Sequence, residues 1–82
     1  MSITSKAQFM AASDGQSYAV QDIAAALAEG MAPEAIQVRT DASAERLDSK
    51  ATTAEGRAFA ARYREAARTL IAEHLQAGRE AG

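Results

Sequence analysis

Residues 52–77 read TTAEGRAFAARYREAARTLIAEHLQA, a stretch without proline that is rich in strong helix formers. Its large apolar side chains recur three or four positions apart, so they share one arc of a helix. Thr52 and Glu55 have the spacing of a capping box at the start of this stretch. We therefore expect a long amphipathic C-terminal helix over about residues 53–77, roughly 38 Å in length.

A short helix is also expected near the N-terminus. Ser5 and Gln8 have the spacing of a second capping box, and apolar residues follow them up to about Ala12. Residues 13–15 read SDG, a combination typical of turns. We therefore expect the first helix to end there and a new helix to begin at about Ser17.

The middle of the chain contains signals for one helix end and one helix start. Residues 20–27 show apolar side chains at helical spacing, Gly30 is placed to end that helix, and Pro33 is placed in the first turn of the next one. Residues 36–40 also alternate between apolar and polar side chains, so a short strand is the alternative to helix there. Residues 41–50 are polar, and we expect them to form a mobile loop with at most one helical turn.

The composition favours a single small all-α domain over residues 1–82, a bundle of three to four helices. The chain has 22 alanines but only 17 larger apolar residues, so its core is thin for a free monomer. We therefore expect a homodimer, or a partner that completes the core. Cysteine is absent, which excludes disulfides and cysteine-based zinc sites. No apolar run is long enough to span a bilayer, so we expect no membrane contact and a cytoplasmic location.

No arrangement typical of an enzyme is present in the sequence. It contains neither a nucleophile elbow nor a glycine run that could bind phosphate. His74, the single histidine, is expected to lie half-buried at the edge of the apolar arc, because no cysteine or second histidine accompanies it. Asp41, Glu45 and Asp48 lack the glycine of a calcium loop and are expected to form a solvated acidic face. We therefore expect no catalysis, no cofactor, no metal site and no small-molecule substrate.

The positive charges gather in the C-terminal helix. Residues 1–56 carry four Lys or Arg against eight Asp or Glu, whereas residues 57–82 carry five Arg against three Glu. Arginine pairs well with carboxylates and is frequent in binding hot spots, as is tyrosine. Tyr63 also fits the core, with its hydroxyl at the edge. Arg62 and Glu73 fall on the solvated side of the helix, opposite its apolar arc. The expected partner-binding residues lie on the arginine rim of this helix: Arg57, Tyr63, Arg64, Arg68 and Leu75.

Residues 30–39, with the sequence GMAPEAIQVR, resemble the turn and second helix of helix-turn-helix DNA-binding domains. Residues 27–36 are similar to the equivalent stretch of LuxR-type regulators. The resemblance implies a reading helix over residues 32–39, in which Gln37 and Arg39 would reach bases and phosphates. The same residues are explained by a glycine that ends one packed helix and a proline that begins the next. The net charge of −2 also opposes binding to a polyanion.

The function expected from the sequence is therefore non-enzymatic binding of a protein partner, as a regulator or an inhibitor. Short, acidic, alanine-rich chains without cysteine are frequent among phage- or plasmid-encoded antagonists of bacterial machinery, such as anti-CRISPR proteins. This analogy concerns size and composition alone, since no motif of such a family is present. A helix-turn-helix-like nucleic-acid-binding regulator is the alternative, and a self-assembling structural subunit is a third hypothesis.

Overall fold

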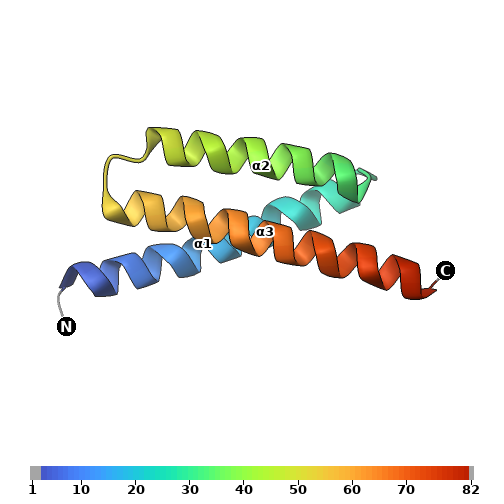
Figure 1. Cartoon of the computed structure of the whole chain (residues 1–82), viewed down its shortest axis with the longest axis horizontal. Coiled ribbons are helices and arrows are strands. Elements are labelled where there is room, and N and C mark those ends of the chain that lie inside the picture. The colour runs from blue at the N-terminus through green and yellow to red at the C-terminus, as the bar shows by residue number, and fades with distance from the viewer. Residues whose placement is uncertain (1–2, 82) are drawn as a thin grey trace.

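The structure, a computed structural model, describes residues 3–81, with side chains described for residue 10 and residues 13–77. Three helices account for nearly all of the described chain: α1 (Ile3–Ala28), α2 (Pro33–Lys50) and α3 (Ala54–Ala81) (Figure 1). No strand occurs among the described residues. The all-α prediction is confirmed, with three helices in place of the three to four expected.

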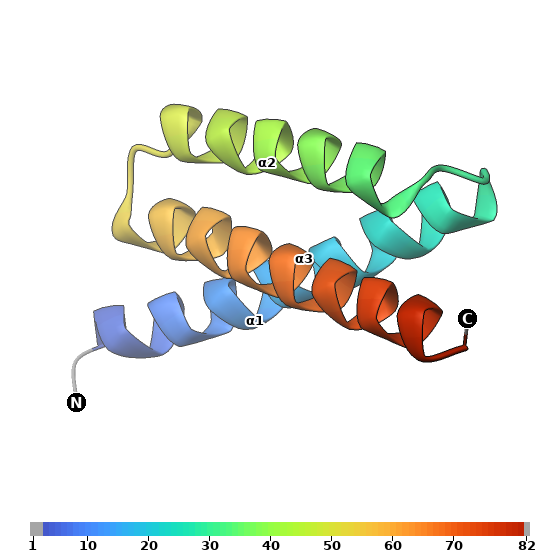
Figure 2. The ribbon, with the colours of Figure 1, turned by 45° about the vertical axis from the view of Figure 1, so that its right-hand side comes forward.

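The central helix of the fold is α3, which packs against both of the others. α1 runs in the same direction as α3 and crosses it, whereas α2 runs antiparallel along the other side of α3 (Figures 1 and 2). α1 and α2 contact each other little. The molecule is elongated, with extents of 48 × 24 × 16 Å and a radius of gyration of 14.0 Å, against about 12 Å for a compact domain of this length.

The expected break at residues 13–15 is wrong, because α1 continues through it to Ala28. Gly15 is buried where α1 crosses α3, and a Cβ atom at this position would overlap the carbonyl oxygen of Phe59. This glycine therefore serves a close approach of two helices and does not end one. The capping box at Ser5 and Gln8 lies outside the described side chains.

The loop expected at residues 41–50 is also wrong, and so is the alternative of a strand at residues 36–40. Both segments belong to α2, because Ile36, Thr40 and Ala44 form a buried stripe on the side that faces α3. Leu47 continues this stripe as a partly buried side chain. One large and two small buried residues at helical spacing are enough to pack a helix that is otherwise polar.

The turn between α1 and α2 has the local chemistry expected from the sequence. Gly30 has a positive φ of 86°. Its N–H donates to the carbonyl of Leu27, and the N–H of Met31 donates to the carbonyl of Ala26. These two bonds form a Schellman motif, which favours glycine at this position. Pro33 then occupies the first turn of α2, as predicted.

The core is built mainly from small side chains. Six of the ten buried apolar residues described are alanines, and the largest fully buried side chains are Tyr63, Ile36 and Ile71. Alanine lets helices approach closely but buries little apolar area per residue. The thin core inferred from the composition is therefore found in the structure.

The N-cap of α3 is Thr53, and the capping box expected at Thr52 and Glu55 is wrong by one residue. The Oγ1 atom of Thr53 accepts a hydrogen bond from the N–H of Gly56 at 3.0 Å. We expect Thr53→Ala to lower the free energy of unfolding by about 1 kcal/mol, because that N–H loses its acceptor. The matched variant Thr52→Ala should leave it nearly unchanged, and urea denaturation of both variants measures the difference. Equal losses for the two variants would contradict this assignment of the cap.

Candidate protein-binding surfaces

A buried tyrosine and an aspartate connect the middle of the fold. Tyr63 of α3 is 0% exposed, and its hydroxyl donates a hydrogen bond of 2.7 Å to Oδ2 of Asp22 on α1. The ring of Tyr18 lies 5.6 Å from that of Tyr63, and Phe59 adds a third aromatic ring beside Tyr18. Burial, followed by the hydrogen bond to Asp22, raises the pKa of Tyr63 far above its ordinary range. The side chain therefore stays neutral and acts as a hydrogen-bond donor.

Alkaline pH should therefore destabilise the fold through Tyr63. Because its pKa is raised by folding, its contribution is fully present below the ordinary tyrosine pKa of about 10 and is lost as the pH rises above it. The expected slope approaches about 1.4 kcal/mol per pH unit for one proton. Urea denaturation of the wild type and of Tyr63→Phe between pH 9 and pH 11 tests this. Parallel pH profiles for the two proteins would contradict it.

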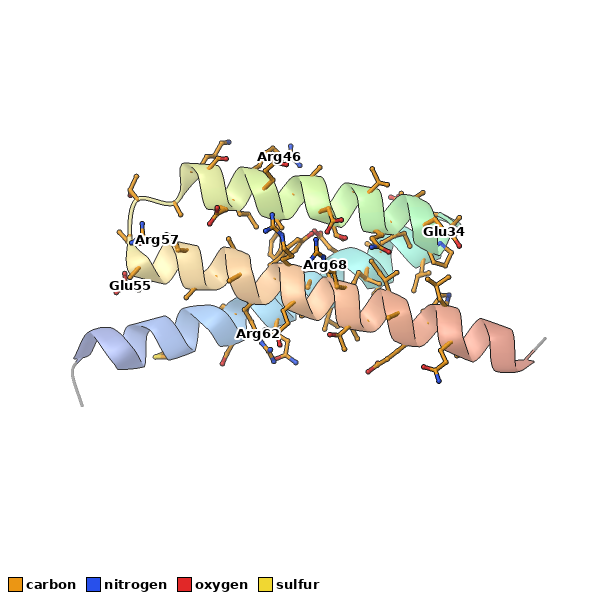
Figure 3. The ribbon with its side chains drawn as sticks, viewed as in Figure 1. Glu34, Arg46, Glu55, Arg57, Arg62 and Arg68 are labelled. Atoms are coloured by element: carbon orange, nitrogen blue, oxygen red, sulfur yellow. The ribbon has the colours of Figure 1, made fainter. Side chains whose placement is uncertain are left out.

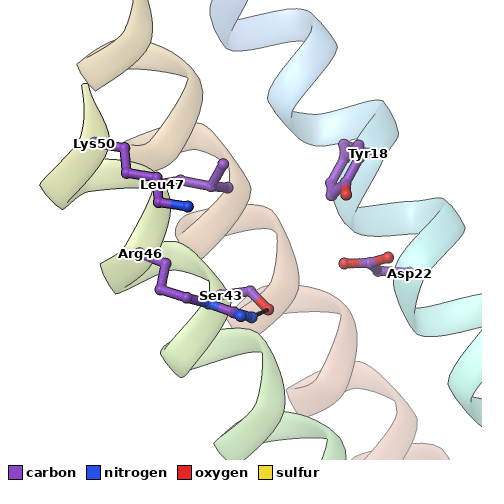
Figure 4. A pocket seen from close by; sticks show the side chains of 6 residues that line it. All are labelled: Tyr18, Asp22, Ser43, Arg46, Leu47 and Lys50. Atoms are coloured by element: carbon purple, nitrogen blue, oxygen red, sulfur yellow. Dashed lines mark hydrogen bonds between the residues drawn. The ribbon is translucent and has the colours of Figure 1, made fainter. Parts of the chain in front are cut away.

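A cleft separates α1 from α2 because the two helices meet only near the turn that joins them. It encloses about 220 Å³ and is lined by Tyr18 and Asp22 from α1 and by four residues from α2. Figure 4 shows the two walls facing each other, with Ser43, Arg46, Leu47 and Lys50 on α2. Tyr18 is 49% exposed at this cleft, so half of an aromatic side chain is open to solvent. This concavity is named the α1–α2 cleft below.

The α2 wall of the cleft is positively charged, although the whole chain carries a net charge of −2. Arg39, Arg46 and Lys50 are seven and four positions apart, which places them on one side of α2. Arg39 does not line the cleft and lies 3.8 Å from Glu29. Arg46 donates only to Oγ of Ser43, and no ion pair within the described part of the chain holds Arg46 or Lys50.

A second concavity lies between α1 and α3. Two hollows of about 340 and 380 Å³ adjoin each other there and share Val20, Leu70 and Glu73. Ile23, Ala24 and Leu27 extend its apolar lining along α1. Val20, which is 46% exposed, is one of the large apolar side chains that this fold leaves open to solvent. This surface is named the α1–α3 groove below.

The arginine rim predicted on α3 does not form one open patch. Arg57 is exposed at the first turn of α3, while Arg68 lies between α2 and α3 (Figure 3) and its Nε is 3.3 Å from Oδ1 of Asp41. Arg64 is half-buried, and its Nε is buried without a hydrogen-bond partner. This ion pair joins α3 to α2 at the surface, where it contributes little to stability.

The two apolar members of the predicted set belong to the interior of the fold. Tyr63 is fully buried, which agrees with the core placement weighed from the sequence, and it presents no surface to a partner. Leu75 is partly buried and packs against the core. Periodicity placed both on the correct side of the helix, but it could not show that the other two helices cover that side.

The residues expected to read nucleic acid are both exposed on α2. Gln37 and Arg39 lie two positions apart, so they point to different sides of the helix. Arg39 is engaged by Glu29 and also donates to the sulfur of Met31 at 3.4 Å. α2 itself carries three cations against four acids.

His74 is exposed and lines the α1–α3 groove, whereas the sequence predicted a half-buried histidine. The difference arises because α1 crosses α3 and has turned toward α2 by this level of the helix (Figure 1). Glu45 and Asp48 are exposed, while Asp41 pairs with Arg68. No group of three potential metal-ligating side chains occurs among the described residues. Within the same residues, no helix is long and apolar enough to cross a membrane.

Sequence reasoning missed both concavities. The α1–α2 cleft combines side chains more than twenty positions apart, and it exists only because α1 and α2 diverge on either side of α3. If residues 41–50 had been predicted as helical, the spacing of Arg39, Arg46 and Lys50 would have indicated a basic stripe. Comparison with protein-family models, with curated proteins and with solved structures finds no match to this chain.

Proposed function

We propose that this chain acts by binding a protein partner through the α1–α2 cleft, without catalysis, as a regulator or an inhibitor in the cytoplasm. One observation carries the proposal: a half-exposed Tyr18 on one wall faces Arg46 and Lys50 on the other, and neither of these two cations has an ion pair among the described residues. Tyrosine and arginine are the residue types that most often dominate interface energies. A cleft that combines them is suited to hold a side chain of another protein.

The chemistry of the cleft favours an acidic segment as the part of the partner that is bound. Arg46 has guanidinium donors free besides the one directed at Ser43, and these can hold a carboxylate in a bidentate pair. Tyr18 and Leu47 provide apolar contact beside it. Asp22 also lines the cleft, where its Oδ2 accepts the hydrogen bond from the hydroxyl of Tyr63.

This proposal moves the expected site from the arginine rim of α3 to the basic wall of α2. The move follows from burial and pairing, because Tyr63 is enclosed and Arg68 already has an acidic partner. The analogy with small phage- or plasmid-encoded antagonists such as anti-CRISPR proteins fits the same proposal. Such an inhibitor would act by occluding an acidic surface of a larger complex.

A tagged pull-down from the lysate of the source cell, with and without nuclease, tests the proposal. The wild type is compared with two charge-reversal variants. The wild type should recover a discrete protein in both samples, and Arg46→Glu should lose it. Arg57→Glu is the matched control, because it makes the same change of charge at an exposed arginine outside the cleft. Circular dichroism should show equal helicity for all three proteins.

Two results would overturn the proposal. If Arg57→Glu loses the partner and Arg46→Glu retains it, the binding surface is the α3 rim predicted from the sequence. If the recovered material disappears with nuclease, the helix-turn-helix-like alternative takes its place. Heparin chromatography should then retain the wild type and release it with moderate salt, whereas the protein-binding proposal expects it to flow through.

A further inference from the structure

One stripe of α3 along the α1–α3 groove has opposite charges at its two ends. Arg62, Ala66, Thr69 and Glu73 are four, three and four positions apart, so they lie on one face of the helix. All four line the α1–α3 groove on the side that faces away from α2, where Figure 3 shows Arg62. Of the two central residues, Ala66 is buried at the floor of the groove and Thr69 is exposed, and both are small enough to let another helix approach closely.

The floor beside this stripe is apolar and open to solvent. Val20 and Ala24 of α1 are exposed there, next to the partly buried Leu27 and Leu70. An apolar groove with a charged rim is typical of a surface that packs against protein. Covering it would also enlarge a core that is built mainly from alanine.

We propose that the α1–α3 groove binds a second copy of this chain, and that α3 packs antiparallel against α3 of that copy around a two-fold axis. The axis passes midway between Arg62 and Glu73, close to Ala66 and Thr69. Arg62 of each copy then faces Glu73 of the other, and the two ion pairs form together, as the symmetry of an isologous interface requires. A parallel arrangement would instead place like charges opposite each other.

Arg62 has an acidic partner within its own helix, whereas Glu73 has none among the described residues. Arg62 donates to Oε1 of Gln16 at 2.8 Å and lies 3.2 Å from Oε1 of Glu65, so its guanidinium is held at the edge of the groove. Glu73 is exposed, and no ion pair within the described residues holds it. The inference is independent of the α1–α2 cleft, which lies on the other side of α1 and stays open in this dimer.

Charge-reversal variants test the dimer when their mass is measured by sedimentation or light scattering over a range of concentrations. The wild type should have twice the chain mass, whereas Glu73→Arg and Arg62→Glu alone should each be monomeric, because each places two pairs of like charges in the interface. The mixture of these two variants should regain the double mass, since every pair is then complementary again. The double variant R62E/E73R should dimerise for the same reason.

The control variant Arg57→Glu changes the charge outside the groove and should remain a dimer. Circular dichroism of Glu73→Arg should equal that of the wild type, because this side chain is exposed and makes no ion pair among the described residues. A wild type that stays monomeric up to about 1 mM overturns the proposal. A dimer that tolerates Glu73→Arg, or a mixture that stays monomeric, overturns it equally.

Discussion

Gly15→Ala should destabilise this protein by about 1 to 2 kcal/mol, although alanine is the better helix former. The added Cβ would overlap the carbonyl oxygen of Phe59 and lie 3.2 Å from the backbone nitrogen of Tyr63. These are backbone atoms, so α1 and α3 would have to separate at their crossing. Overpacking of this kind commonly costs about 1 to 3 kcal/mol, and here it should exceed the gain of about 1 kcal/mol in helix propensity.

Thermal unfolding followed by circular dichroism measures this loss, and Gly56→Ala provides the matched control. Gly56 lies in the first turn of α3, and its added Cβ would meet Cβ of Ala51 at 3.2 Å, Oγ1 of Thr53 at 3.3 Å and Cα of Ala51 at 3.5 Å. The control should therefore melt close to the wild type. A rise in melting temperature for Gly15→Ala would show that the two helices are not in close contact at this residue.

Tyr63→Ala should have the largest effect of any single substitution considered, a loss of about 3 to 5 kcal/mol. It removes the largest fully buried side chain together with its ring contact to Tyr18 and its hydrogen bond to Asp22. Because the core contains few other large side chains, we expect the cooperative thermal transition to be lost. The conservative variant Tyr63→Phe removes only the hydroxyl and should cost about 1 kcal/mol.

Tyr18→Ala is the matched aromatic control for this experiment. Tyr18 touches the same cluster but is 49% exposed, so its removal should cost much less than that of Tyr63. Urea denaturation of the three variants gives the order of the losses. Equal losses for Tyr18→Ala and Tyr63→Ala would contradict the placement of Tyr63 at the centre of the core.

Local sequence patterns predicted the structure correctly where residues close together in the chain determine it. The apolar arc of residues 52–77 predicted a helix there, and Gly30 and Pro33 predicted the turn before α2. Such features depend on backbone conformation and on neighbours a few positions away. Even so, the N-cap was predicted one residue early, since Thr52 and Thr53 are chemically equal and only the path of the linker selects between them.

The candidate sites were less predictable than the helices. Arg68 was expected to face a partner, but it pairs with Asp41 of a helix that the sequence had suggested was a loop. Arg62 and Glu73 were correctly expected to be away from the core, yet their position along an apolar groove depends on where α1 crosses α3. Charge and periodicity identify the side of a helix, and they do not identify what lies next to it.

From composition and spacing alone, this chain could be recognised as all-α, with a thin alanine-rich core and a long helix near its C-terminus. The role of Gly15, the helical state of residues 41–50 and both concavities depended on contacts between helices. The physical reason is the same in each case. Spacing and propensity act along one segment, and they do not determine which backbone from elsewhere in the chain packs against it.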